Sequence, residues 1–399
     1  MLRRLLLALS LVLVASPVLA RPVILIGIDG FRADYLDRGL TPTLAQLAQA
    51  GATAEGGMRP SYPTVTYPNF YTLVTGLHPD RHGLVYNAMT DPDLPGREFH
   101  LRDRAEVMDG VWWEDGEPIW VTAERVGQVT ASVFWPGSEA RIRAERPTYW
   151  LPFDQSLTSH QRVNLLLGWF NLAEAERPDF AALYFDIVDT QGHHYGPDSP
   201  ELEAALAEVD AAVGRLVEGL RGRGIQADLV IVADHGMAAI SAERIVWLDD
   251  LVAAEALAEV GHGSVATVTA EPGREAEVAG ALAGSHPHLE CWRREDIPVR
   301  YAYGRHRRVA PLICQADVGW TIGVRGRTDP ARVRGGAHGY DNAAPEMRAL
   351  FIASGPSFLP GTRLSEVDSV DVQPLLARLL GIAAPAGDGR LADTAPALR

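Results

Sequence analysis

The sequence predicts an α/β fold in which a central, mostly parallel sheet is flanked by helices. Three apolar runs have the composition of strands that are buried on both faces, and each ends in a carboxylate. They are residues 23–28 before Asp29, residues 180–189 ending in Asp189, and residues 229–233 before Asp234. Helical periodicity between such runs is typical of parallel sheets. Because ligands of these sheets bind beyond the carboxyl ends of the strands, we expect the three carboxylates to mark a functional site.

The remaining elements follow in a regular order along the chain. A helix is expected at residues 40–50, where Thr41 is placed as N-cap and Pro42 as the first helical residue. Further elements are expected as a strand at 129–135, helices at 157–175 and 202–220, a strand at 349–353 and a helix at 372–380. Between about residues 237 and 335 the alternation weakens, which indicates an inserted subdomain. The tail after Gly381 is rich in Ala, Pro and Gly, and we expect it to be loose.

Residues 1–20 have the pattern of a secretory signal peptide. Arg3 and Arg4 form a charged start, residues 5–15 form an apolar stretch too short to span a bilayer, and residues 18–20 match a cleavage site. No later stretch is long and apolar enough for a membrane helix. The sequence therefore predicts an exported protein, periplasmic or secreted, without a membrane anchor.

The charge balance excludes some classes of partner. The net charge is −15, from 51 acidic and 36 basic residues, which argues against a nucleic-acid polymer or an anionic membrane surface. The chain has no lysine, so Arg, His, a metal ion or backbone groups must contact any bound phosphate. The two cysteines, Cys291 and Cys314, either form a disulfide in an oxidising compartment or remain as buried thiols.

Histidines accompany the strand-end carboxylates. His193 follows Asp189 by four residues, His235 follows Asp234 directly, and His338 lies in a glycine-flanked loop. Carboxylate oxygen and imidazole nitrogen are ligands of zinc at catalytic sites. Six such ligands suit two metal ions, and a metal pair can clamp the attacking and leaving oxygens of an in-line displacement.

A threonine is the candidate nucleophile. Pro68 suits the first turn of a helix, which places Thr66 at a helix N-terminus, where an anion is favoured. A threonine at such a position is usually only a cap. Beside a metal site it gains a second role, because metal coordination activates a hydroxyl for attack. Asn69, one turn later, is expected to donate a hydrogen bond to a phosphoryl oxygen.

Together these residues resemble the nucleotide pyrophosphatase/phosphodiesterase family of the alkaline phosphatase superfamily. The resemblance covers most of the chain outside residues 1–20 and the insertion. Its matching stretches are residues 28–32, 66–69 with 73–79, 135–138, 189–197, 234–237 and 338–342.

The resemblance implies an alkaline phosphatase-like sandwich with a small α+β capping insertion. The catalytic domain would comprise residues 21–236 and 336–385, and residues 237–335 would form the cap. It also implies two Zn²⁺ ions. One zinc would take Asp29, Asp234 and His235 and activate Thr66, and the other would take Asp189, His193 and His338. His194 competes with His193 by adjacency, but the family spacing favours His193, and His82 is interpreted as structural.

The implied reaction is hydrolysis of a phosphodiester or pyrophosphate bond through a phospho-threonine, on a small-molecule substrate. Family members that take nucleotides stack the base on aromatic rings, and Tyr67, Tyr184 and Tyr149, with the neighbouring Trp150, are the candidates. For each of these rings, packing in the hydrophobic core is the alternative to stacking on a base. A phospholipid head-group phosphodiesterase, a phosphate monoesterase or a phosphonate hydrolase on the same scaffold remains open. A sulfatase is disfavoured because Thr66 replaces the required Cys or Ser, and a non-catalytic binding protein is disfavoured because every ligand position is competent.

Overall fold

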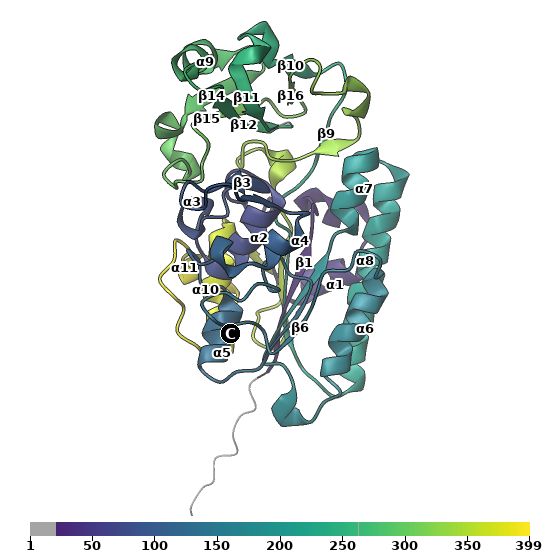
Figure 1. Cartoon of the computed structure of the whole chain (residues 1–399). Coiled ribbons are helices and arrows are strands. Elements are labelled where there is room, and N and C mark those ends of the chain that lie inside the picture. Colours follow the sequence, from purple (N-terminus) through teal and green to yellow (C-terminus); the bar gives the residue numbers. More distant parts are fainter. Residues whose placement is uncertain (1–20, 262) are drawn as a thin grey trace, which may run out of the picture.

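The computed structural model describes residues 21–261 and 263–399, so the expected signal peptide at 1–20 lies outside the described residues. Its centre is a sheet with the strand order β19-β2-β18-β8-β1-β7-β5-β6 (Figure 1). The strands are β1 (Val23–Ile28), β2 (Ala52–Ala54), β5 (Thr130–Val133), β6 (Tyr149–Leu151), β7 (Phe180–Phe185), β8 (Asp228–Val232), β18 (Phe351–Ser354) and β19 (Thr362–Leu364). Strand β18 is antiparallel to both neighbours, whereas the other neighbouring pairs are parallel. The expected mostly parallel sheet is confirmed.

Helices cover both faces of this sheet (Figure 1). One face carries α1 (Pro42–Ala50), α6 (Ser159–Trp169), α7 (Ile187–Tyr195) and α8 (Pro200–Gly222), and the other carries α2 (Thr66–Thr75), α5 (Ile119–Arg125) and α10 (Val372–Leu380). The other α-helices of the described residues are α3 (Pro79–His82), α4 (Arg104–Met108), α9 (Glu275–Leu282) and α11 (Leu391–Thr394). Within residues 21–261 and 263–399, no helix has the length and apolar character needed to cross a membrane.

The buried strand β1 sets the position of α2. All six residues of β1 are buried, as its apolar composition predicts. A Cβ atom at Gly27 would lie 2.6 Å from the ring of Phe70 and 2.8 Å from the ring of Trp135. Glycine therefore lets α2 approach the sheet closely, and this approach brings the first residue of α2 to the end of β1.

A second lobe forms the top of the molecule in Figure 1. It contains an antiparallel sheet in the order β11-β12-β15-β14-β13, which packs with α9 around a separate hydrophobic cluster. Its strands are β11 (Leu257–Val260), β12 (Val265–Ala270), β13 (Gly284–His286), β14 (Leu289–Arg293) and β15 (Leu312–Ala316). Cys291 and Cys314 face each other on β14 and β15 and form a disulfide. We call residues 238–335 the upper lobe.

Short paired strands complete the structure. Antiparallel pairing of β9 (Ala238–Ala239) with β17 (Gly336–Ala337) brings together the points where the chain enters and leaves the upper lobe. The other pairs are β3 (Ala88–Thr90) with β4 (Glu98–His100), and β10 (Ile245–Trp247) with β16 (Thr321–Gly323). The β9–β17 pair explains how an insertion of this length leaves the main sheet undisturbed.

Three sequence predictions need correction. The strand expected at 129–135 is shorter, since β5 ends at Val133, and the helix expected at 157–175 ends at Trp169. The expectation of a loose tail is wrong. Thr394 and Ala397 are buried, and Leu398 forms a β-bridge with Phe358. The tail packs beside β19, which is an edge strand of the main sheet. Edge strands have unpaired backbone groups, and the tail covers this edge.

Candidate functional site

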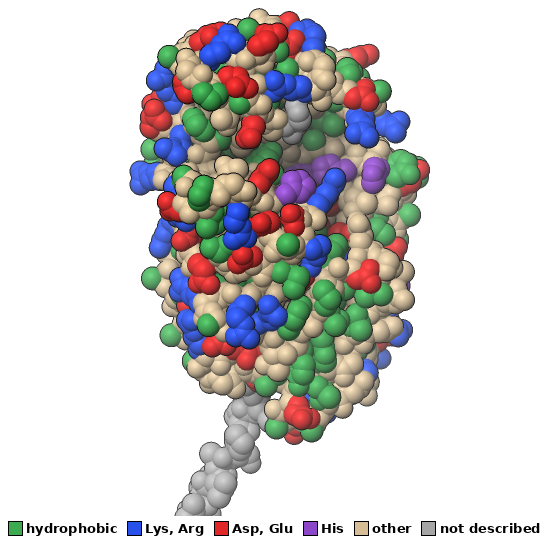
Figure 2. All heavy atoms as spheres, viewed as in Figure 1, with side chains coloured by type: hydrophobic (Ala, Val, Ile, Leu, Met, Phe, Trp, Pro, Cys, Tyr) green, Lys and Arg blue, Asp and Glu red, His purple; other side chains and the backbone are tan. Residues whose placement is uncertain are grey.

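Six potential metal ligands converge beyond the carboxyl ends of the central strands. Within each of two groups, one ligand atom from every residue lies within 4.8 Å of the others. The buried triplet is Asp29, Asp234 and His235, and the open triplet is Asp189, His193 and His338. Figure 2 shows histidine side chains gathered in a hollow between the upper lobe and the body. The rings of His235 and His338 stack with centroids 3.5 Å apart, so the two triplets are adjacent.

The buried triplet lies at the ends of β1 and β8. The backbone N–H of Gly30 donates to Asp234 Oδ1 at 3.2 Å, and Asp234 Oδ2 lies 2.9 Å from His235 Nε2. Burial, followed by repulsion from neighbouring carboxylates, raises the pKa of Asp29 and of Asp234 well above the usual value. Without a cation, this arrangement disfavours the ionised acids. A bound divalent cation would reverse that preference.

The open triplet differs from the expectation for Asp189. The predicted strand stops at Phe185, and Asp189 lies instead in the first turn of α7. His193 follows one turn later, and residues four apart share one helix face. Asp189 Oδ1 lies 3.4 Å from His193 Nε2 and 3.6 Å from His338 Nε2. The His193 side chain is 41% exposed, so this triplet faces the hollow.

The carboxylates of both triplets fit a bound cation. Among the described residues, three buried carboxylate oxygens have no hydrogen-bond partner: Asp29 Oδ1, Asp189 Oδ1 and Asp234 Oδ2. An unpaired buried acceptor costs about 1–3 kcal/mol, and more when it is charged. Coordination to a metal ion would satisfy all three oxygens.

The three histidines are also oriented to bind a cation. Each Nδ1 atom contacts a backbone carbonyl: His193 with Gly336 at 2.8 Å, His235 with Gly236 at 2.9 Å, and His338 with Thr64 at 2.8 Å. Since Nδ1 donates the proton, Nε2 is left with a free lone pair, as in metal-ligating histidines. His193 Nε2 and His338 Nε2 lie 3.0 Å apart, a contact that a shared cation would stabilise. Burial and the other two imidazoles lower the pKa of His338 well below its usual value, which keeps it neutral.

Thr66 lies against the buried triplet. It is the first residue of α2, as predicted, and its Oγ1 atom lies 3.4 Å from His235 Nε2. Two residues earlier, Thr64 joins this loop to the His338 loop. Its Oγ1 donates to the carbonyl of Tyr340 at 3.0 Å and accepts from the N–H of Gly339 at 2.9 Å. The loop that carries Thr66 is thereby tied to the open triplet as well.

The role predicted for Asn69 is wrong in this structure. Asn69 is fully buried, and its amide nitrogen donates to the carbonyls of Ser61, Pro63 and Val65. Both amide hydrogens are used inside the loop before Thr66, so none is left for a substrate. Asn69 therefore holds the shape of that loop.

Asn87 is a residue that the sequence reasoning missed. Its Oδ1 atom accepts a hydrogen bond from the N–H of Tyr67, the residue after Thr66, at 2.9 Å. This contact turns the amide of Asn87 toward the start of α2. The 20-residue separation in sequence contains no periodic signal that would have linked the two positions.

Two of the three predicted stacking tyrosines are placed differently from the expectation. Tyr184 is buried, and its hydroxyl donates to Asp29 Oδ2 at 2.5 Å. Tyr149 pairs in register with Ala131 near the start of β5, stacks on Trp169 and donates to a backbone carbonyl. It therefore lies toward the opposite end of the sheet, about 17 Å along the strand direction from the level of Asp29.

Tyr67 remains beside the site. Its ring lies 5.7 Å from that of Phe99 and 5.9 Å from that of Trp113, and it is partly exposed. Burial raises the pKa of Tyr67 to about 12, so the ring is neutral at physiological pH.

Tyr184→Phe is expected to weaken metal binding by about 10- to 100-fold, because Asp29 loses the donor that orients its carboxylate. Tyr149→Phe is the matched control and should leave metal affinity unchanged. The measurement is metal affinity by chelator competition. Phenylalanine preserves stacking, so an unaltered Tyr184→Phe protein would contradict the role in holding Asp29.

Comparison with known proteins identifies relatives along most of the chain. Residues 23–341 match the family described as type I phosphodiesterase / nucleotide pyrophosphatase. An uncharacterized pyrophosphatase/phosphodiesterase of Schizosaccharomyces pombe is 37% identical over 391 residues, which are 94% of this chain and 80% of the relative. The bis(5'-adenosyl)-triphosphatase of Xenopus laevis is 34% identical over 375 residues, which are 93% of this chain and 80% of that relative.

A solved structure shows the same fold. Murine ectonucleotide pyrophosphatase / phosphodiesterase 5, in an inactive threonine-to-alanine variant in complex with AMP, matches with a TM-score of 0.89 and 34% identity. The match covers 95% of this chain and 100% of the murine chain. The architecture is thus the alkaline phosphatase-like sandwich that the sequence predicted.

Proposed function

The chain belongs to the type I phosphodiesterase / nucleotide pyrophosphatase family, and from this premise we propose that it hydrolyses nucleotide phosphodiester or pyrophosphate bonds with Thr66 as nucleophile and two Zn²⁺ ions as cofactors. The observation that carries the proposal is the placement of the Thr66 hydroxyl, which lies at the start of α2 and 3.4 Å from His235 of the buried triplet.

Each triplet would hold one zinc ion. Zinc accepts carboxylate and imidazole ligands, and three protein ligands leave a coordination position open for chemistry. The bound pair would lower the pKa of the Thr66 hydroxyl and stabilise charge on the attacking and leaving oxygens. The burial of Asp29, Asp234 and His235 favours a tightly held ion there, whereas the exposed His193 gives the second position access to the substrate.

The residues of the chain then have distinct tasks. Thr66 attacks phosphorus, and a covalent phospho-threonine forms as the leaving oxygen departs. The N-terminus of α2 favours negative charge at this position. Asn87, rather than Asn69, donates to a nonbridging phosphoryl oxygen. Water subsequently attacks phosphorus, releasing a nucleoside monophosphate and restoring the Thr66 hydroxyl.

A nucleotide is the proposed substrate. Tyr67 presents a partly exposed neutral ring directly after the nucleophile, where it would stack on a base. One relative is named as a bis(5'-adenosyl)-triphosphatase, and another was solved with AMP. These names support a nucleotide over a lipid head group.

The predicted cap of residues 237–335 contains the upper lobe, and we propose that this lobe covers the site. Ser264 donates to the carbonyl of His338, and Tyr86 of the body donates to the carbonyl of Val265 at 3.0 Å.

We also propose export to the periplasm or the medium. The pattern of residues 1–20 and the Cys291–Cys314 disulfide support an oxidising compartment.

A substrate panel tests the proposed function. We expect kcat/KM to be highest for a nucleotide diester or ATP and lower for a glycerophosphocholine lipid and a simple phosphate monoester. Chelator should remove turnover, and added Zn²⁺ should restore it. A preference for the monoester would contradict the diesterase assignment, and a preference for the choline lipid would contradict the nucleotide assignment.

A further inference from the structure

One arginine side chain joins the two segments that supply the buried triplet. Arg32 lies three residues after Asp29, on the segment that leaves β1. Its Nη1 atom donates a hydrogen bond to the carbonyl oxygen of Met237 at 2.9 Å. Met237 lies two residues after His235, on the segment that leaves β8. The contact therefore connects both ligand-bearing segments directly.

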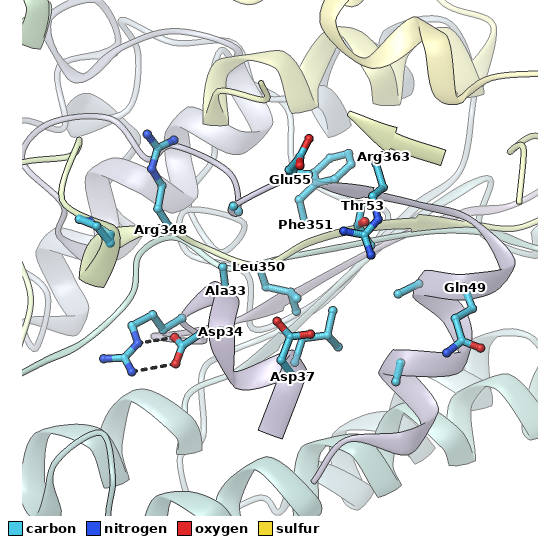
Figure 3. A pocket seen from close by; sticks show the side chains of 18 of the residues that line it. Ala33, Asp34, Asp37, Gln49, Thr53, Glu55, Arg348, Leu350, Phe351 and Arg363 are labelled. Carbon is cyan, nitrogen blue, oxygen red and sulfur yellow. Dashed lines mark hydrogen bonds and ion pairs between the residues drawn. The ribbon is translucent and has the colours of Figure 1, made fainter. Parts of the chain in front are cut away.

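Other groups fix the orientation of this guanidinium. Its Nη2 atom donates to Asp34 Oδ2 at 2.9 Å, and its Nε atom donates to the other carboxylate oxygen. The guanidinium carbon lies 5.0 Å from the centre of the Tyr35 ring, and the Arg32 side chain is only 15% exposed. Figure 3 shows the two contacts of Asp34 at the wall of a cavity of about 840 Å³. Because Asp34 binds the guanidinium at two atoms and the Tyr35 ring lies against it, the Arg32 side chain has one favourable position.

The segment that Arg32 contacts also orients the His235 ring. His235 Nδ1 donates to the carbonyl of Gly236, and Arg32 binds the next carbonyl along the chain. The segment has no room to move on this side. A Cβ atom at Gly236 would lie 2.1 Å from the carbonyl oxygen of Glu346 and 2.9 Å from Cγ of Arg32. A shift of Arg32 would therefore change the direction of the His235 lone pair.

We propose that Arg32 is a positioning residue for the buried triplet, which holds the Asp29 and Asp234–His235 segments at the separation that a metal ion requires. The inference rests on the proposed two-metal function and adds a residue that is not itself a ligand. Ligand atoms bind a metal tightly only when their supports fix them in advance. Lysine keeps the charge but lacks the planar fork, so it cannot bind Asp34 in bidentate fashion and Met237 together.

Arg32→Lys tests this role, with Arg325→Lys as the matched control. Arg325 also binds carboxylates, Asp249 and Asp250, and lies 5.0 Å from the Trp247 ring, but these partners are in the upper lobe. The measurements are zinc stoichiometry, zinc affinity by chelator competition, and the thermal midpoint of the metal-free protein. We expect one of the two zinc ions to bind about 10- to 100-fold more weakly in Arg32→Lys and neither to change in the control.

Combining Arg32→Lys with His193→Ala identifies the affected triplet. The His193→Ala variant should retain only the ion of the buried triplet, and adding Arg32→Lys should weaken the binding of that ion by the same factor. Unchanged zinc affinity in Arg32→Lys would overturn the proposal while the wild-type protein still binds two ions. Equal weakening of both ions, with a lower metal-free midpoint than the control, would show a general structural role and overturn it as well. A wild-type protein without zinc would instead overturn the two-metal function itself, and this inference with it.

Discussion

Thr66→Ala is expected to lower kcat by at least about 1,000-fold, because the variant lacks the hydroxyl that we propose as the nucleophile. The metal content should stay near that of the wild-type protein, since the six ligands of the two triplets are untouched. The measurements are kcat on a nucleotide diester and zinc per chain. This pair of readings separates the loss of the nucleophile from the loss of the site.

Thr66→Ser is the matched control for this experiment. Serine keeps the hydroxyl beside His235, so measurable turnover and a covalent phospho-serine should remain. A Thr66→Ala protein that keeps a tenth or more of wild-type turnover would remove Thr66 as nucleophile. Loss of zinc in Thr66→Ala would show instead that the hydroxyl is needed to hold the metal.

His193→Ala is expected to lose one of two zinc ions and to lower kcat by about 100-fold or more, since three protein ligands become two. His194→Ala should keep both ions and near wild-type turnover. The His194 side chain is exposed beside Tyr195, whereas His193 Nε2 lies 3.4 Å from Asp189 Oδ1. Because the two residues are adjacent, general damage to α7 would affect both variants alike.

Metal analysis of both variants decides between the two histidines. Zinc lost in His194→Ala and retained in His193→Ala would reverse the ligand assignment. Zinc lost in both would indicate that α7 itself requires both side chains. The structure favours His193 because its Nδ1 atom donates to the carbonyl of Gly336, which aims Nε2 at the open triplet.

The positions of most of the candidate ligands were predictable because they follow from local pattern, whereas His338 lies in a loop that no such pattern places. Asp29 and Asp234 come directly after apolar runs, and parallel strands deliver their carboxyl ends to one edge of a sheet. Asp189 and His193 are four residues apart, a spacing that a helix converts into a shared face. The element that carries Asp189 was nevertheless mistaken for a strand, because the apolar run continues through Ile187 and Val188 into α7.

The side chains around these ligands were less predictable. Tyr184 and Tyr149 are both aromatic and lie on strands of the same sheet that are separated only by β5, yet Tyr184 holds Asp29 and Tyr149 lies toward the opposite end of the strands. Asn69 is one turn from Thr66, but its amide is consumed by three carbonyls of its own loop. Asn87, which is distant in sequence, contacts the residue after Thr66 instead.

The sequence by itself determined the α/β class, the identity of the candidate ligands and the candidate nucleophile, because strand burial, helix spacing and ligand chemistry are local properties. Only the tertiary structure decided which polar groups support them. Asn87, Thr64 and Arg32 reach the site through contacts that join separate loops. Such contacts depend on which loops the fold brings together. Whether a polar side chain can still donate a hydrogen bond to a ligand depends on its neighbours in space, and the sequence does not give these neighbours.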